Sequence, residues 1–158
     1  MSQVIDLWKA ASGLPVVGGT LGKRVFSLAF SQKAPYFASI HPRMTELRPN
    51  YAEVVIRKRR SVQNHLGTVH AIALCNGLEM AMGALAEATI PPSKRWIPKG
   101  MQVSYTAKAS SDITCTAETT QQQWDAAEGD LPVRVSGVRD DGTVVIEGVI
   151  LLWVTSKK

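Results

Sequence analysis

The hydrophobic residues of the first third of the chain recur at helical spacing. Apolar side chains return every three or four positions in residues 3–11 and again in 20–33, which predicts two amphipathic helices. Pro35 marks the end of the second helix. The apolar side of that helix is formed by Leu21, Val25, Leu28 and Ala29. We therefore expect residues 1–35 to form a helical extension.

Most of the remaining chain alternates between apolar and polar positions, which is typical of strands. Residues 37–48 and 51–60 are expected to be extended, and the β-branched centre of the second segment favours a sheet. After residue 100, alternation resumes in three further segments, and Asp140-Asp141-Gly142 predicts a tight hairpin before a final strand over 144–155. The pattern predicts an antiparallel sheet of five or six strands.

One long helix interrupts these strands, over about residues 69–89, and ends at Pro91-Pro92. Apolar residues occur all around its surface, so we expect it to be buried on all sides. A sheet of this size that is covered by one helix curls around it. The expected fold class is α+β, with residues 1–158 forming a single domain whose core spans 36–155.

Glu79 is the only charged side chain between Ala71 and Ala86 of this helix. Burying an unpaired carboxylate is costly, so Glu79 must be protonated, paired or partly in contact with water. A carboxylate in an apolar cleft is a candidate catalytic group. The alternative is a purely structural role, in which a neighbouring backbone group or Asn64 forms hydrogen bonds with the carboxylate and no reaction takes place.

The start of the helix supplies a second candidate group. The first backbone N–H groups of a helix have no intrahelical acceptor and are suited to hold a carbonyl oxygen or a developing oxyanion. His70 stands at this position, where a side chain more often caps the helix than takes part in catalysis. Nine residues separate His70 from Glu79, so the two side chains point to opposite sides of the helix.

Composition narrows the possible partners. The net charge is +5 and the densest basic cluster is Arg57-Lys58-Arg59-Arg60, which favours anionic ligands or forms the solvated end of a strand. No helix carries a basic stripe, so nucleic acid is not expected. Cys75 and Cys115 lack metal-site spacing, and we expect no metal or other cofactor. The first residues lack a secretory pattern and no uninterrupted apolar run could span a membrane, so a cytoplasmic location is expected.

The run from Asn64 through His65, Gly67 and His70 to Glu79 resembles the signature of hot-dog-fold acyl-CoA thioesterases of the phenylacetate-associated type. The order of elements is similar throughout the chain, and the N-terminal helices resemble those of the thioesterase-like DUF4442 branch. The resemblance implies a hot-dog fold, a coenzyme A or acyl-carrier thioester as substrate, and a homodimer or homotetramer.

The resemblance also implies roles for individual residues. Glu79 would attack the thioester carbonyl or activate water, and Asn64 would orient water or substrate. The backbone N–H of Ala71, next to His70, would hold the thioester oxygen. In the family, the carboxylate and this donor generally come from two subunits. Further substrate contacts would come from His65, Gly67, Ile72 and Gly83.

Two features depart from the family pattern. Ala71 and Ile72 replace the two glycines that follow the histidine, and Gly83 stands where some relatives have a hydroxyl group that holds water. These changes favour an alternative function, a non-catalytic module that binds an acyl group or lipid. We expect a group of cations to flank the entrance of the site and meet the phosphates of coenzyme A: Arg59, Arg60, Lys94 and Arg95.

A second alternative is a hydroxyacyl dehydratase. In that class of hot-dog enzyme, a histidine precedes the catalytic glutamate by fourteen residues, as His65 precedes Glu79 here. The residues that follow His65 do not match the dehydratase pattern. A dehydratase would require the His65 imidazole to reach the same substrate carbon as Glu79.

Overall fold

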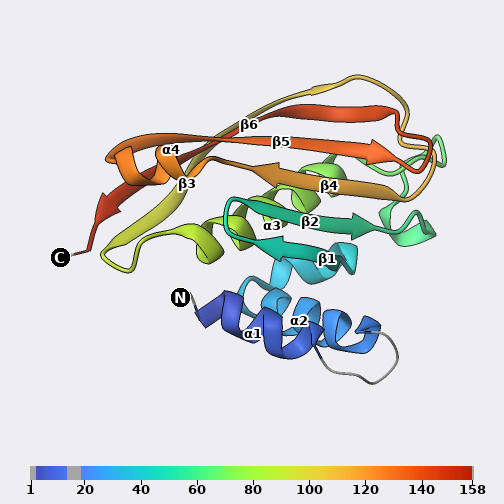
Figure 1. Ribbon diagram of the computed structural model, residues 1–158. Helices are drawn as coiled ribbons and strands as arrows, with labels where there is room; N and C mark the ends of the chain where they lie inside the picture. The colour runs from blue at the N-terminus through green and yellow to red at the C-terminus, as the bar shows by residue number, and fades with distance from the viewer. Residues whose placement is uncertain (1–2, 14–18, 158) are drawn as a thin grey trace.

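The computed structural model describes residues 3–13 and 19–157 (Figure 1). Its helices and strands follow one another in this order: α1 (Gln3–Ser12), α2 (Thr20–Lys33), the 3₁₀ helix η1 (Pro35–Ile40), β1 (Arg43–Arg48), β2 (Tyr51–Ile56), the 3₁₀ helix η2 (Arg60–Val62), α3 (Ala71–Thr89), β3 (Lys94–Tyr105), β4 (Ile113–Glu118), α4 (Gln121–Ala126), β5 (Gly129–Arg139) and β6 (Val144–Ser156).

The six strands form one antiparallel sheet in the order β1-β2-β4-β5-β6-β3. The sheet curves around α3, which lies against its concave face (Figure 1). This arrangement confirms the predicted α+β class and the long helix covered by a curved sheet. The strands β1 and β3 form the two edges of the sheet.

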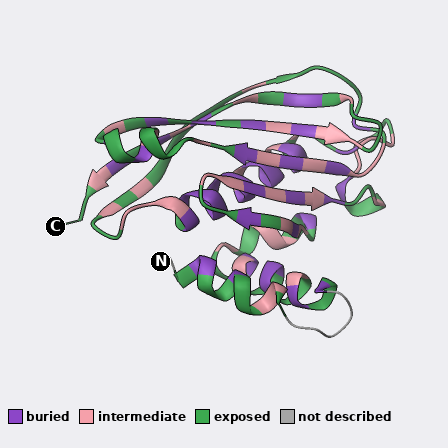
Figure 2. Ribbon diagram, in the orientation of Figure 1, coloured by how far each residue is buried: buried purple, intermediate pink, exposed green. Residues whose placement is uncertain are grey.

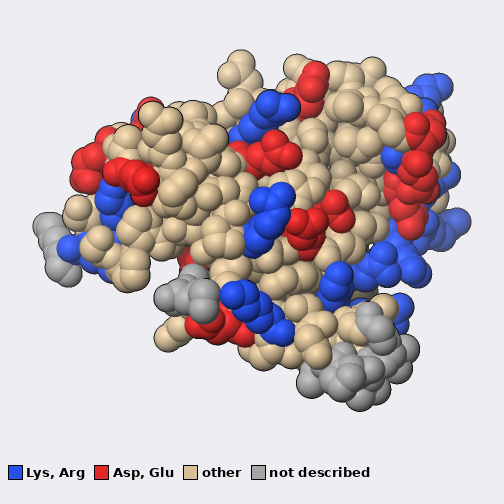
Figure 3. Space-filling model, in the orientation of Figure 1, with Lys and Arg blue, Asp and Glu red and all other residues tan. Residues whose placement is uncertain are grey.

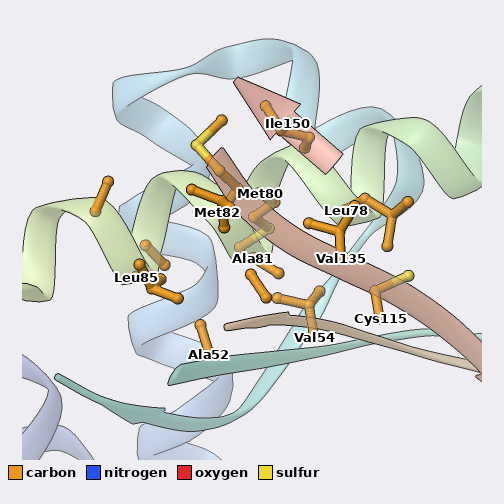
Figure 4. Close-up of a cluster of buried hydrophobic side chains, with 14 of the residues drawn as sticks. Ala52, Val54, Leu78, Met80, Ala81, Met82, Leu85, Cys115, Val135 and Ile150 are labelled. Atoms are coloured by element: carbon orange, nitrogen blue, oxygen red, sulfur yellow. The ribbon is translucent and has the colours of Figure 1, made fainter. Parts of the chain in front are cut away.

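The core is built where α3 meets the strands. Leu78, Met80 and Leu85 of α3 are fully buried against residues such as Val54 and Ile150 of the sheet (Figure 4). Gly77 allows this close approach, because a Cβ there would lie 2.4 Å from Ile56 Cδ1. By length and a mean hydropathy of 1.2, α3 could cross a membrane, but 67% of that stretch is buried inside the protein, as in a core helix.

The expectation that α3 is buried on all sides is only partly correct. The helix is largely buried (Figure 2). A stripe that includes Ile72, Cys75 and Glu79 nevertheless remains partly open. Ile72 is 54% exposed. The stripe is open because the sheet covers only one side of the helix and the N-terminal helices cover only part of the other side.

The helix α2 does not pack through the apolar side that its sequence spacing predicted, but through another face. Leu21, Val25 and Leu28 of α2 are exposed, whereas Phe26 is buried. Phe26 packs edge-on against the ring of Trp8 in α1, with ring centroids 5.1 Å apart. Aromatic contacts between the two helices therefore decide which side of α2 is buried.

Three element boundaries differ from the sequence prediction. The segment 37–48 is not extended throughout, because η1 occupies residues 35–40 before β1 begins. The second strand ends at Ile56 rather than residue 60. The strand β3 begins at Lys94, earlier than the alternating pattern indicated, because a bulge between Pro98 and Gly100 interrupts the alternation.

Candidate functional site

Glu79 lies in a cavity between α3, β3 and the N-terminal helices. The cavity has a volume of about 370 Å³. Its lining consists of Val4, Phe30, Lys33, Ala34, Phe37, Glu79, Met82, Gly83, Glu87 and Trp96. Most of these side chains are apolar, so the cavity can hold a hydrophobic group beside the carboxylate of Glu79, with Glu87 also in its lining.

The Glu79 side chain is half-buried, and no hydrogen bond or ion pair to it occurs within the described part of the chain. Of the three states expected from the sequence, the paired one is therefore absent from the described part of the chain, and the carboxylate is partly exposed. The structural alternative in which Asn64 satisfies Glu79 does not occur, because Asn64 bonds elsewhere. An unpaired carboxylate facing an apolar cavity can accept a proton from a water molecule or approach a bound carbonyl carbon.

The start of α3 is arranged around His70. The His70 side chain caps the helix, because its Nδ1 accepts a hydrogen bond from Ile72 N–H at 3.1 Å. The backbone N–H of His70 donates to the carbonyl of Val62 at 2.8 Å. His70 is thus a capping residue, which is the more common of the two roles considered for it. The Ile72 N–H is already hydrogen-bonded and does not remain available to a substrate oxygen. The neighbouring N–H of Ala71 has no acceptor among the described residues.

Glu79 and Ala71 cannot act on the same carbonyl group within one chain. They are eight residues apart on one helix, which places them about 12 Å apart along its axis. A nucleophile or base and an oxyanion donor must both lie within about 3 Å of the reacting group. The two groups can cooperate only if they come from different copies of the chain.

A second, smaller cavity of about 220 Å³ lies at the start of α3 and is lined in part by His70, Ile72 and Asn76. Asn76 is only 5% exposed, and its Nδ2 donates to the Tyr36 carbonyl and to Ser39 Oγ, both at 3.2 Å. The Asn76 Oδ1 is buried and has no partner among the described residues. The amide holds η1 against α3 and leaves one buried acceptor at this cavity.

The loop before α3 is stabilised by Asn64. Its Oδ1 accepts hydrogen bonds from Leu66 N–H at 2.9 Å and Thr68 N–H at 3.2 Å, and its Nδ2 donates to Thr68 Oγ1 at 2.9 Å. Gly67 has a φ of 72°, which favours glycine. His65 is exposed and does not line the Glu79 cavity of its own chain.

The four cations expected at one entrance lie at opposite ends of α3. Arg59 and Arg60 precede the helix, whereas Lys94 and Arg95 open β3 beyond its last turn. Lys94 donates to the Ala127 carbonyl, and Arg95 Nε donates to Thr155 Oγ1 at 3.2 Å. Because α3 is about 27 Å long, the two pairs do not surround one entrance within a chain.

The inner face of β3 continues the open stripe of α3. Met101 pairs with the inward-facing Ile150, so it points to the side of the sheet that carries α3, yet it is 36% exposed. Tyr105 follows on the same face, and its hydroxyl lies 3.4 Å from Cys75 Sγ. This hydrogen bond, with burial, raises the pKa of Tyr105. The inner face of β3 and the open stripe of α3 therefore form one partly apolar surface.

Glu79 and Gly83 were both predicted as site residues, and both line this cavity. The residues that form the other walls of the cavity were not predicted. Five of the ten lining residues come from the N-terminal helices and the segment that follows them, including Val4 and Phe37. No local signal connects these positions with Glu79. Trp96 was also missed; its Nε1 donates to Glu87 Oε1 at 2.9 Å at the rim of the cavity. Within residues 3–13 and 19–157, no group of His, Cys, Asp or Glu side chains could hold a metal ion.

The family model described as a domain of unknown function, DUF4442, matches residues 22–154. The chain belongs to the DUF4442 family. No curated protein is similar enough to this DUF4442 chain to match it. The crystal structure of the structural-genomics protein APC5556 is 44% identical in sequence, with a TM-score of 0.83, and the similarity covers 98% of this chain and 99% of that one.

More distant structures show the same fold. PA5026 of Pseudomonas aeruginosa, described as a protein of unknown function and probable thioesterase, is 20% identical, with a TM-score of 0.75 over 83% of this chain and 93% of its own. A thioesterase family protein of Silicibacter pomeroyi is 16% identical, with a TM-score of 0.68 over 83% and 96% of the two chains. The predicted DUF4442 branch is confirmed by the family model, and the predicted hot-dog fold is confirmed by these structures.

Proposed function

We propose that this protein hydrolyses an acyl thioester, carried by coenzyme A or by an acyl carrier protein. The observation that carries the proposal is the Glu79 cavity: one unpaired, half-buried carboxylate faces a largely apolar space that can accept an acyl group. Thioesterases among proteins of the same fold support this reaction class. Glu79 would act as the base that activates water, or as the nucleophile.

The oxyanion donor would be the Ala71 N–H of a second copy of the chain. Ile72 N–H is bonded to His70, whereas Ala71 N–H has no acceptor among the described residues, so Ala71 supplies a free donor in the first turn. Hydrogen bonds to the developing oxyanion would stabilise the transition state more than the substrate. The His70 cap would fix the conformation of this turn, and Asn64 would fix the loop that leads into it.

A homodimer would complete the site. The strand β3 pairs only with β6 among the described strands, so its outer edge is available for pairing with a second β3. Two-fold pairing there would also cover the open surface around Met101 and Ile72. Each site would then combine Glu79 of one chain with the helix start of the other.

The test is an assay of the purified protein against a panel of acyl-CoA thioesters, with Glu79→Gln measured in parallel. We expect kcat/KM of the variant to fall by roughly 10²–10⁴, because a positioned general base contributes about that factor. Hydrolysis that is undiminished in Glu79→Gln would exclude Glu79 as the catalytic group.

A non-catalytic acyl-binding module is the second candidate. One observation favours it: both polar atoms of the Asn64 side chain are engaged within their own loop, which leaves little capacity to orient water. Gly83 likewise provides no hydroxyl group near Glu79. Tight acyl-CoA binding without turnover across the panel would support this reading over hydrolysis.

A further inference from the structure

A strongly basic cavity lies away from the Glu79 cavity, between α2, the end of η1 and β2. It has a volume of about 280 Å³ and contains four arginines and one histidine among its lining: Arg24, His41, Arg43, Arg57 and Arg59. No aspartate or glutamate lines it. Figure 3 shows basic side chains gathered on the right of the molecule, between the N-terminal helices and the sheet.

The two cavities lie on different faces of α2. Arg24, Ser27 and Ser31 of α2 face the basic cavity, whereas Phe30 and Lys33 face the Glu79 cavity. At 100° per residue, the centres of these two sets are about 120° apart around the helix, although Ser27 and Phe30 are separated by only about 60°. The basic cavity is therefore a separate site from the one proposed for thioester hydrolysis.

The arginines of this cavity have no counter-charge in the described part of the chain, where the ion pairs involve Arg48, Lys99 and Arg139 instead. Glu53 lies on the same face of β2 as Val55 at the cavity wall, but its carboxylate accepts from Thr45 Oγ1 at 2.6 Å and from Tyr51 at 3.2 Å. Arginine stays protonated at all ordinary pH values, so the positive charges persist.

One N–H group in each of two guanidinium groups also lacks a hydrogen-bond acceptor among the described residues. The Nε atoms of Arg43 and Arg59 are buried and unpartnered among the described residues. Arg59 is nevertheless held in place, because its Nη2 donates to the carbonyls of Ile40 at 2.9 Å and His41 at 3.3 Å. Buried donors without acceptors are rare and costly, and a preformed set of them matches an anion with several oxygen atoms.

The serines at the cavity do not supply the missing acceptors. Ser27 Oγ donates to the Lys23 carbonyl at 2.7 Å and accepts from Met44 N–H at 2.8 Å. Ser31 Oγ donates to the Ser27 carbonyl at 2.8 Å. Both hydroxyl protons are used within α2, so the arginines and His41 are the side chains that remain to donate to a ligand.

We propose that this cavity binds a phosphate-bearing small molecule, with Arg43 and Arg59 as buried donors and Arg24 and Arg57 closing over the ligand from the surface. Guanidinium groups pair with phosphate oxygens in a bidentate manner, and the volume suits a phosphate or diphosphate group. The ligand could be the nucleotide part of coenzyme A or a free phosphate compound, and both offer the same chemistry to the arginines.

The test is calorimetric titration of the full chain with pyrophosphate at constant ionic strength. We expect saturable binding to the natural sequence that weakens by about tenfold or more in Arg43→Gln, because a hydrogen bond to a charged group is lost. Arg134→Gln, an exposed position on β5 with the same change of charge, serves as the control and should bind like the natural protein. Absence of binding, or equal weakening in both variants, would overturn the proposal.

Competition identifies the source of the phosphate. If coenzyme A and adenosine 3′,5′-bisphosphate displace pyrophosphate, and Arg43→Gln raises KM for acyl-CoA without changing kcat, the ligand is the substrate's nucleotide. If they do not displace it, the site serves a free phosphate compound. Both results support a phosphate site. Glu79→Gln should bind pyrophosphate normally, so failure of the proposed hydrolysis and failure of the phosphate site are distinguishable.

Discussion

Val4 in the first helix and Glu79 in the central helix line the same cavity. The N-terminal extension is therefore part of the wall of the candidate site, and the space available to an acyl group depends on it. The aromatic contacts from Trp8 through Phe26 to Phe30 fix the position of this wall relative to α3.

Shortening Val4 should enlarge the cavity. We expect Val4→Ala to lower the free energy of unfolding by roughly 1–2 kcal/mol, since two buried methyl groups are lost, and to shift acyl-CoA preference toward bulkier chains. Chemical denaturation and kcat/KM across the acyl-CoA panel measure both effects. Leu7→Ala, on the same helix but 54% exposed, should change stability by less than about 0.5 kcal/mol and leave the preference unchanged.

The two glycines of α3 should respond in opposite ways to alanine. A Cβ at Gly83 would approach nothing closer than the Trp96 ring at 3.6 Å, so Gly83→Ala should raise the free energy of unfolding by roughly 0.5–1 kcal/mol. A Cβ at Gly77 would lie 2.4 Å from Ile56 Cδ1 and 2.9 Å from Cys115 Sγ, so Gly77→Ala should destabilise by roughly 1–3 kcal/mol. Equal effects in urea denaturation would contradict this packing.

The two cysteines should react at very different rates with a thiol reagent. Cys115 is completely buried, and burial raises the pKa of its thiol to about 12, with a smaller effect from nearby Cys75. The neutral thiol does not act as a nucleophile, so at pH 8 only Cys75 should react in the folded protein. Reaction of Cys115 should require unfolding, and should then follow the unfolding rate. A fast-reacting thiol in Cys75→Ser, which retains only Cys115, or two fast thiols in the natural protein, would contradict the buried position.

The open face of β3 should govern self-association. Met101 is 36% exposed on the inner face, so Met101→Glu should leave the fold intact but weaken the proposed dimer by placing a charge in its centre. Val149 on β6 is 38% exposed on the opposite face, and Val149→Glu is the matched control. Light scattering after size-exclusion chromatography should show a lower mass for Met101→Glu alone. Identical masses for the two variants would argue against the β3 interface.

The sequence predicts the central elements of the fold because their patterns are local. Residues 69–89 have the length and apolar character of a core helix, and alternation identifies the strands on either side. Alternation fails in the first half of β3, where Pro98 and the following bulge shift the register. The buried face of α2 is also unpredictable from spacing alone, because the aromatic partners of Phe26 lie on another helix.

The candidate site is predictable only in part for the same reason. Glu79 stands out in the sequence as a single charge in an apolar helix. The cavity walls and the basic cavity both gather residues from several elements, such as Arg24 from α2 and Arg57 after β2, and only the folded chain brings them together. The split of the four expected cations between the two ends of α3 likewise follows from the length of the helix.

The most direct test of the central claim is subunit complementation between two inactive variants. Ala71→Pro removes the free N–H while keeping the helix, because proline is accepted at the first helical position and His70 before it is extended, with φ −65° and ψ 140°. Ala71→Gly, which keeps the N–H, is the control and should remain active. Ala71→Pro should lower kcat by roughly 10²–10³.

Glu79→Gln and Ala71→Pro chains are then unfolded together, refolded and assayed. Mixed dimers contain one site with an intact Glu79 and an intact Ala71 N–H, so activity should return to about one quarter of the natural level after random pairing. Activity that stays at the level of the separate variants, with mixed dimers present by native mass spectrometry, would contradict a site built from Glu79 of one chain and Ala71 of the other.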